Sequence, residues 1–290
     1  MIEVIFIPLQ LIVFFLIFSF PFNRFVIENF KLKIEYNYYN FLVYNILIHL
    51  GFYLILSFFK FNLNKIFIVE CLIGAFFLAF NIRYILKKKI KHYKISHNFI
   101  LFFFINIFIF FNIANNLKLE WDAFHWIYKT NIFLQGGSYK DIANVPLSYY
   151  PHLGTYLWGY FWSNSFLNIE YFGRLIFPFL YLSGFFFIFS NYLKQKKDHI
   201  FLLFIVFFIF ITLDFYLFGG YQDYLIFFEL IVMSKLFSEI SENKNLNLNI
   251  FLSIVCMSLI MWTKQEGFFY FIILSILFLF NLNYKKRLFL

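Results

Sequence analysis

Residues 98–114 read NFILFFFINIFIFFNIA, an apolar run that contains no charged residue. A transmembrane helix needs about 20 mostly apolar residues, so this run and its flanks are long enough to cross a bilayer. The basic cluster KKKIKHYK (87–94) precedes it, and a polar segment at 120–165 follows. Because basic clusters favour the cytoplasmic side, we expect this helix to carry the chain from the cytoplasm to the outer face.

The composition of the whole chain points to the same environment. Of its 290 residues, 62% are hydrophobic, 27% aromatic and only 13% charged. Soluble domains average about 45–50% apolar and about 25% charged residues. A water-soluble core could not bury this much apolar surface, so the lipid bilayer is the expected solvent and partner. The net charge of +9 lies in short clusters between apolar runs. This is the pattern of the positive-inside rule, so we expect no nucleic-acid partner.

Apolar runs recur along the chain, and they predict an all-α polytopic membrane protein with about nine or ten transmembrane helices. The expected spans are Ile2–Phe22, Phe41–Phe59, Ile66–Leu86, Asn98–Ala114, Tyr171–Tyr192, Ile200–Phe218, Leu225–Ile240, Ile250–Thr263 and Phe268–Phe280. The segment Leu153–Trp162 is apolar but short, and it follows Pro151. If it is re-entrant or interfacial, nine spans result, with the N-terminus outside and the C-terminus inside; if it spans, there are ten.

The organisation expected from these runs is an N-terminal three-span region at 1–97, with a basic cytoplasmic loop, and a core at 98–290 with an outer loop at 115–150. The start, MIEV, has no basic residue, so we expect the first run to remain as a span rather than be cleaved as a signal peptide. The two cysteines, Cys71 and Cys256, both lie in apolar runs and support neither a disulfide nor a metal site. No metal or cofactor is expected.

The polar segment begins with EWDAFHWIYKTNIFL (120–134), which predicts a short amphipathic helix closed by Gly136–Gly137. Asp122, His125 and Lys129 have the spacing of one helix face. The other face holds the aromatic residues Trp121, Phe124 and Tyr128. With its aromatic face in the headgroup layer, such a helix would present a carboxylate, an imidazole and an ammonium to water or to an anionic ligand. The functional interpretation makes Asp122 a general base and the cations phosphate contacts; the alternative is an ordinary interfacial helix with solvated charges.

Further candidate residues follow this helix. Proline at 151 makes the entry to the next segment rigid, with Tyr150 before it and His152 after it. His152 can contact a phosphate, relay a proton, or simply lie at the interface. Short outer loops hold Asp223, Lys264 and Glu266, where either cavity lining or solvation explains them.

Charged residues inside the predicted spans are costly and usually face partners. Glu170 and Arg174 have the spacing of an intrahelical pair, although Arg174 can instead face an anionic headgroup. For the remaining charges, Glu70, Glu229 and Lys235, we expect structural pairing.

Taken together, these residues resemble the GT-C class of integral-membrane glycosyltransferases, and within it the protein mannosyltransferases and aminoarabinose transferases. The likeness rests on WDAFHW (121–126), the Tyr150–Pro151–Leu153 pattern, EYFGR (170–174), GGYQDY (219–224) and the Lys264–Glu266–Gly267 turn. It covers roughly residue 98 to the end, so region 98–290 is the GT-C-like core. Two features depart from the class: three spans precede the acidic loop where the best-known members have one, and the sequence ends at Leu290 where members usually continue. A truncated or minimal form is therefore expected.

The resemblance implies transfer of a sugar from a polyprenyl-phosphate donor to a lipid or cell-surface glycan acceptor, at the non-cytoplasmic face of a bacterial plasma membrane. It implies that Asp122 is the catalytic base, with Glu120 as the fallback. The implied phosphate or donor contacts are Lys264, Arg174 and His152. The further candidate substrate-binding residues are His125, Lys129, Tyr150, Asp223 and Glu266. Two other functions remain open: a transporter or flippase for a lipid-linked or anionic substrate, which would use Arg174, Glu229 and Lys235, and a non-catalytic membrane subunit.

Overall fold

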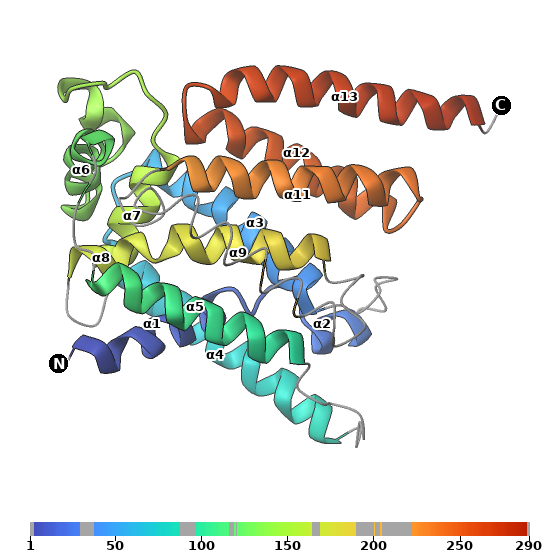
Figure 1. Cartoon of the computed structure of the whole chain (residues 1–290), viewed down its shortest axis with the longest axis horizontal. Helices are drawn as coiled ribbons and strands as arrows, with labels where there is room; N and C mark the ends of the chain where they lie inside the picture. Colours follow the sequence, from blue (N-terminus) through green and yellow to red (C-terminus); the bar gives the residue numbers. More distant parts are fainter. Residues whose placement is uncertain are drawn as a thin grey trace.

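The structure, a computed structural model, describes residues 3–29, 38–87, 97–115, 119, 121–163, 169–189, 200, 204 and 222–288. These residues form helices and connecting turns, with no β-strand among them (Figure 1). The helices are α1 (Glu3–Ile17), α2 (Arg24–Asn29), α3 (Tyr38–Ser57), α4 (Leu63–Lys87), α5 (His97–Asn115), α6 (Trp121–Leu134), the 3₁₀-helix η1 (Tyr139–Asn144), α7 (Leu153–Ser163), α8 (Glu170–Arg174), α9 (Ile176–Phe189), α11 (Asp223–Ser241), α12 (Leu246–Thr263) and α13 (Gly267–Leu288). The all-α prediction is confirmed for this part of the chain.

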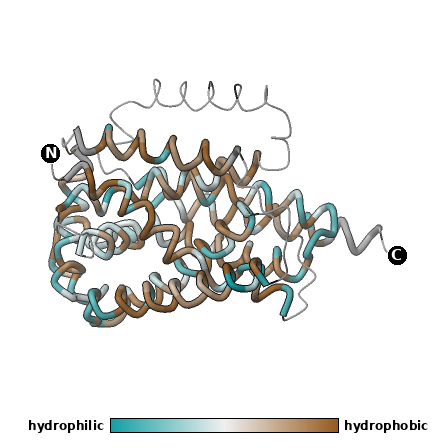
Figure 2. Tube along the Cα trace, turned by 90° about the horizontal axis from the view of Figure 1, so that it is seen from below, coloured by the Kyte–Doolittle hydropathy of each residue, from teal (hydrophilic) through white to brown (hydrophobic). Residues whose placement is uncertain are grey.

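Several helices are apolar and long enough to belong in a membrane. Among the described residues, four stretches meet the length and hydropathy of a span, namely Tyr38–Ser57, Leu63–Tyr84, Glu170–Phe189 and Leu246–Thr263. Three shorter apolar helical stretches are Ile5–Ile17, Phe99–Ile113 and Gly267–Leu282. Figure 2 shows that hydrophobic residues cover most of the long helices. The chain is therefore a helical membrane protein. The predicted span Ile200–Phe218 lies outside the described residues except at positions 200 and 204.

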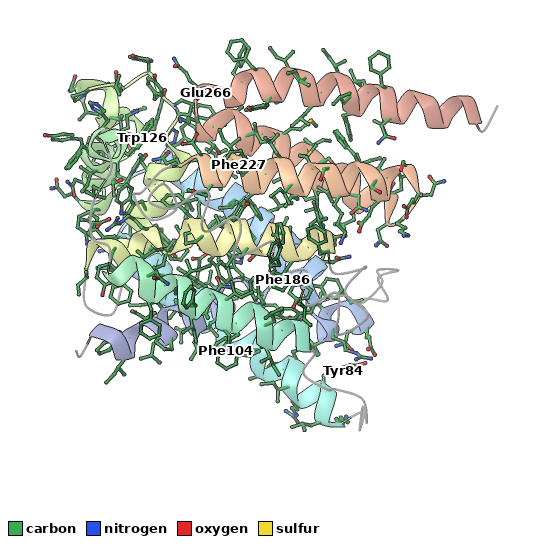
Figure 3. All side chains as sticks on the ribbon, in the orientation of Figure 1. Tyr84, Phe104, Trp126, Phe186, Phe227 and Glu266 are labelled. Carbon is green, nitrogen blue, oxygen red and sulfur yellow. The ribbon has the colours of Figure 1, made fainter. Side chains whose placement is uncertain are left out.

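The long helices run roughly side by side, and their connections gather at two ends (Figure 1). We call one of these the α6 end: it contains α6, η1, α7, the start of α11 and the turn between α12 and α13. The opposite end contains α2, the last turn of α4 and the turn between α11 and α12. Figure 3 places Trp126 of α6 and Glu266 of the α12–α13 turn at the same end. The polar segment and two of the predicted outer loops therefore meet.

Burial separates the central helices from the peripheral ones. In the span formed by α8 and α9, 83% of the apolar window is buried, whereas in α4 only 11% is buried. Helix α9 packs against α11, α3 and α5, and α12 packs against α11 and α3. Because α3 also contacts α7, the N-terminal helices and the later ones form one bundle. The lipid-facing side of α4 is the outer wall of this bundle.

Helix α1 is shorter than the apolar run from which it was predicted. The run predicted a span to Phe22, but α1 ends at Ile17, and the chain then turns through Phe20–Pro21. The turn is held by the Asn45 side chain of α3. Its amide donates to the carbonyls of Phe18 and Phe22 at 2.9 and 3.0 Å, and its oxygen accepts from the Phe22 amide at 2.7 Å. Apolar composition alone does not reveal this turn.

Helix α7 shows how the ambiguous apolar segment folds. It has 11 residues, and at about 1.5 Å per residue it is about 16 Å long, roughly half of a hydrocarbon core of about 30 Å. Every residue from Leu153 to Phe161 is buried. Helix α6 packs against one side of α7, and α8 packs against another side. Helix α7 is thus a short buried helix near the α6 end, too short to cross a bilayer.

Candidate functional site

Helix α6 carries the two residues that the sequence nominated as catalytic. The helix begins at Trp121, so Asp122 lies in its first turn. The side chain of Asp122 and the whole of Glu120 lie outside the described residues, and their roles stay predictions. The predicted stop is confirmed: Gly136 adopts a φ of 81°, its amide donates to Phe133 O at 2.8 Å, and the Gly137 amide donates to Ile132 O at 2.9 Å. A left-handed glycine of this kind commonly ends a helix.

The predicted orientation of α6 is wrong for Lys129. Its side chain is fully buried, whereas Phe124 and Tyr128 are 52% and 59% exposed. The reason is that α7 packs on the side of α6 that carries Thr130 and Phe133. The sequence spacing correctly grouped residues by face but did not say which face a neighbouring helix would cover.

Lys129 nevertheless has a defined partner. Its ammonium donates a hydrogen bond to the carbonyl oxygen of Tyr150 at 3.0 Å and lies 5.5 Å from the ring centre of Trp126 and 5.9 Å from that of Tyr150. Burial lowers the pKa of Lys129 to about 8. Lys129 thus joins α6 to the Pro151 turn. His125, on the same helix, is half-buried.

His152 lies at the centre of an aromatic cage that joins four segments of the chain. The rings of Phe58, Phe133, Tyr139 and Trp262 lie 4.7–5.8 Å from its imidazole. Burial and, to a lesser extent, the nearby charge of Lys129 lower the pKa of His152 to about 3. The imidazole is therefore neutral at physiological pH. A neutral ring offers no positive charge to a phosphate, which leaves proton transfer or structural support as its possible roles.

The hydrogen bonds of His152 indicate its tautomer. The Ser57 hydroxyl donates to Leu54 O at 2.6 Å, and His152 Nε2 lies 2.7 Å from the Ser57 oxygen. Because the Ser57 proton is already engaged, Nε2 carries the histidine proton and donates it to that oxygen. The other nitrogen, Nδ1, has no hydrogen-bond partner among the described residues. It is a buried acceptor with an available lone pair.

The predicted outer-loop residues form a salt bridge across the same end. Lys264 donates to Asp223 at 2.8 Å, with side-chain exposures of 15% and 38%. This pair ties the start of α11 to the turn before α13. Glu266 lies on that turn and is exposed. The residue before α11, Gln222, also packs closely on α7. A Cβ added at Gly154 of α7 would lie only 2.4 Å from the Gln222 side chain.

The predicted pairing of Arg174 with Glu170 is confirmed. Arg174 Nε lies 2.8 Å from Glu170 Oε1, and the arginine side chain is 2% exposed. Their short helix α8 packs closely on α7, because a Cβ at Gly173 would meet the Trp158 carbonyl at 2.6 Å. Arg174 is thus directed into the protein, behind α7, rather than toward a headgroup.

The charges in α11 are also used within the protein. Glu229 accepts a hydrogen bond from the Thr263 hydroxyl at 2.9 Å. The ammonium of Lys235 donates to Phe187 O at 2.5 Å and to Asn40 at 3.1 Å. These partners match the structural pairing expected from sequence.

A buried polar cluster, which sequence reasoning did not assemble, lies deeper in the protein than the residues of the α6 end. Glu70 of α4 accepts from Tyr53 at 2.8 Å and from Tyr160, and its other oxygen lies 3.1 Å from His49 Nδ1. We call this cluster, together with the polar side chains that continue it along α3 and α7, the polar ladder; its members are His49, Tyr53 and Ser57 of α3, Glu70 of α4, and His152, Tyr156 and Tyr160 of α7. The signal available in the sequence was the four-residue spacing of both triplets within apolar runs.

Two pockets flank these groups. One of about 360 Å³ lies at the α6 end beside Lys60, Asn62, Asn64, Gln135 and Ser163. The other, of about 550 Å³, lies between α3 and α4 and is lined mainly by apolar side chains, with His49 and Glu70 in its wall. Within the described residues, no group of three His, Cys, Asp or Glu side chains is placed to hold a metal ion.

Comparisons with known proteins add no relative. No family model matches the sequence, and no curated protein or solved structure is significantly similar to it. The likeness to the GT-C class therefore rests on the sequence motifs alone, and the site is defined by its own geometry.

Proposed function

We propose that the chain is a membrane glycosyltransferase of the GT-C type, which transfers a sugar from a polyprenyl-phosphate donor to a lipid or cell-surface glycan. The observation that carries this proposal is the cap at the α6 end. There an amphipathic helix with an acid in its first turn, a short buried helix and the Asp223–Lys264 pair lie together beside apolar helices. A lipid-linked sugar phosphate is presented at such an interface between lipid and water.

The proposed topology has the α6 end outside the cytoplasm. With α7 as a re-entrant helix, nine spans result, of which one falls in the largely undescribed region near 200–218. In Figure 1 the N-terminus lies at the α6 end and the C-terminus at the opposite end, in keeping with an odd number of spans. The predicted inner-membrane location goes with the proposed donor, because polyprenyl-phosphate sugars reside in that membrane.

In the proposed reaction, the Asp122 carboxylate takes the proton from the acceptor hydroxyl as that oxygen attacks the anomeric carbon of the sugar. The bond between that carbon and the phosphate oxygen breaks, and polyprenyl phosphate leaves with the bonding electrons. A cation that stabilises the departing phosphate lowers the barrier. Among the three predicted cations Lys129, Arg174 and Lys264, the side chain of Lys264 is the most exposed, at 15%. We assign the phosphate contact to Lys264.

Lys129 and His152 then act as positioning residues. Lys129 holds the Tyr150 carbonyl, and His152 holds the end of α3 through Ser57. Together they fix the Pro151 turn beneath α6. Glu120, His125 and Glu266 remain secondary candidates for contacts with the donor or acceptor.

The experiment replaces Asp122 with Asn and measures sugar transfer in membranes supplied with a panel of polyprenyl-phosphate sugars. Loss of a general base typically costs 10²–10⁴-fold in rate, so we expect transfer to fall by at least about 100-fold. The control is Glu242→Gln at the opposite end, where Glu242 is exposed and pairs with Lys244. Wild-type transfer by a well-inserted Asp122→Asn protein would remove Asp122 from the mechanism.

The alternative of a transporter or flippase is favoured by one observation, the charged and polar groups buried among the helices. Glu70, Glu229 and Lys235 are each less than 9% exposed. The same membranes distinguish the two functions. Movement of a lipid-linked sugar across liposomes without any glycosidic product supports transport, and inactivity except with a co-purifying longer chain supports a subunit role.

A further inference from the structure

The polar ladder is built from two facing stripes. His49, Tyr53 and Ser57 recur every four residues on α3, and His152, Tyr156 and Tyr160 do the same on α7. Residues four apart lie on one helix face, so each triplet forms a stripe along its helix. Together with Glu70, all of these side chains are at most 4% exposed. A row of hydroxyl, imidazole and carboxyl groups therefore runs through an otherwise apolar interior.

The two stripes contact each other at both ends. At the α6 end, Ser57 and His152 are 2.7 Å apart. At the deeper end, the rings of Tyr53 and Tyr160 lie with centroids 4.7 Å apart, and both hydroxyls donate to Glu70. The stripes thus start at the aromatic cage and converge on one carboxylate. Tyr139, which is 37% exposed, is the ring between His152 and the surface.

The deep end holds an exchangeable proton by its geometry. His49 Nε2 lies 3.1 Å from the Phe20 carbonyl, and Nδ1 lies 3.1 Å from Glu70 Oε1. A carbonyl only accepts, so Nε2 carries a proton. A second proton must lie between Nδ1 and Oε1, bound either to the imidazole or to the carboxyl. In both states the His49–Glu70 pair has no net charge, which makes the second proton inexpensive to move.

The middle of the ladder has a gap between the Tyr156 and Tyr160 hydroxyls, which one water molecule would bridge. The Tyr156 hydroxyl is buried without a hydrogen-bond partner among the described residues. Its ring is nearly parallel to that of Tyr160, at 16° with centroids 6.3 Å apart. Parallel rings keep their hydroxyls at a similar separation, which matches two hydrogen bonds through one water, about 5.6 Å. Buried waters commonly satisfy such groups.

The deep end also borders the lipid. His49 and Glu70 lie in the wall of the pocket of about 550 Å³ between α3 and α4. Other lining residues, Phe52, Val69 and Ile73, are 42%, 53% and 38% exposed on the lipid-facing side. An ionisable residue at this depth usually marks a functional site rather than a packing accident.

We propose that the polar ladder is a proton path, which connects the α6 end with a proton-binding site formed by the His49–Glu70 pair. A proton that enters from the α6 end passes to Tyr156, through the bridging water to Tyr160, and then to the Glu70 carboxylate. Each hydroxyl gives up its own proton as it takes the next, so one proton moves and no side chain is consumed. This role is independent of the proposed sugar transfer, because it uses neither Asp122 nor Lys264.

The groups that face Glu70 come from three helices. They are His49 and Tyr53 from α3, Tyr156 and Tyr160 from α7, and the neighbouring Cys71 on α4 itself, while Lys65 lines the same pocket. The turn after α1 contributes the Phe20 carbonyl. Tyr53 and Tyr160 donate hydrogen bonds to the carboxylate, and Lys65 is a cation in the lining of the pocket.

The test places the full-length protein in vesicles of known orientation and changes the pH on one side at a time. The readout is the infrared band of the protonated Glu70 carboxyl, assigned by its loss in Glu70→Gln, or by its shift in Glu70→Asp if the first variant does not fold. We expect the band to follow the pH on the α6 side. In Tyr156→Phe we expect the response to be at least tenfold slower, with the same final amplitude.

The matched control is Tyr39→Phe, a buried tyrosine on α3 outside the ladder, for which we expect the wild-type rate. An unchanged amplitude in Tyr156→Phe shows that the site is intact and that only the path has been interrupted. The proposal is overturned if the band is absent or insensitive to pH, if it follows the opposite side, or if Tyr156→Phe responds at the wild-type rate.

Discussion

The cap at the α6 end and the polar ladder use similar residues in different ways. In the cap, Lys129 is bonded to a carbonyl of a nearby turn and Lys264 to one carboxylate. In the ladder, residues from α3 and α7 converge on Glu70 of α4. The cap groups therefore join neighbouring turns and helix ends, and the ladder groups tie the spans to one another. The difference indicates that polar density in the sequence locates a surface site more easily than an internal one.

Depth also changes what each bond contributes. A hydrogen bond in a dry interior is electrostatically stronger than one near water, and an unpaired group there is costlier. Lys264 and Asp223 keep part of their surface in contact with solvent, whereas Glu70 keeps 4%. We therefore expect mutations in the ladder to have larger effects on stability than equivalent mutations in the cap.

The largest effect is expected for Glu70→Ala. Removing one partner of a buried pair typically costs about 3–5 kcal/mol, because it leaves its partners unsatisfied. Here Tyr53 and Tyr160 lose their acceptor and His49 loses its hydrogen-bond partner. Chemical unfolding in detergent measures the change. Glu242→Ala, an exposed glutamate at the opposite end, serves as the control and should unfold like the wild type. If Glu70→Ala and Glu242→Ala lost the same amount of unfolding free energy, the contrast between interior and surface would be contradicted.

A pH-dependent effect of intermediate size is expected for His152. Its pKa is about 3 in the folded protein and near 6.5 when exposed. Below pH 6.5 the unfolded chain binds a proton that the folded chain does not, so stability falls as the pH drops toward 3. The slope from this one group is at most about 1.4 kcal/mol per pH unit. In His152→Phe this contribution should vanish. If the stability of His152→Phe fell with decreasing pH as steeply as that of the wild type, the cage would not hold a neutral imidazole.

The smallest effect is expected for Lys129→Met in the cap. Methionine keeps the apolar stem but leaves the Tyr150 carbonyl without its donor, while the cost of burying an ammonium disappears. These changes oppose each other, so we expect a net difference within about 1 kcal/mol at neutral pH. The folded pKa of about 8 lies below the ordinary value of 10.5. Wild-type stability should therefore rise between pH 8 and 10.5, and unfolding of Lys129→Met should lack that rise.

The sequence predicted the helical membrane class, α6 and its glycine stop. These features depend on local composition and on residues within a few positions of one another. The orientation of α6 was not predictable, because Lys129 has both a charged end and a long apolar stem and so fits either a wet or a buried face. Only the packing of α7 on Thr130 and Phe133 decides it.

The ladder was beyond sequence reasoning for a different reason. Ser57 and His152 are 95 positions apart, and Tyr160 and Glu70 are 90 apart, so their contacts depend on how α3, α4 and α7 pack. Glu70 was recognised as an unusual charge, but its partners were not. Tyrosines are frequent in this chain, at 21 of its residues, so no single one stood out. The proposed base Asp122 stays a prediction from resemblance.

The orientation of the two ends can be measured with single cysteines on the turns that flank α12. Glu266 lies on the turn at the α6 end and Lys244 on the turn at the opposite end, and both are exposed. In intact cells, a membrane-impermeant maleimide should label Glu266→Cys directly. Lys244→Cys should react only after permeabilisation, and the parent protein, with Cys71 half-buried and Cys256 buried, sets the background. The reverse pattern would place the α6 end in the cytoplasm and contradict transfer at the outer face.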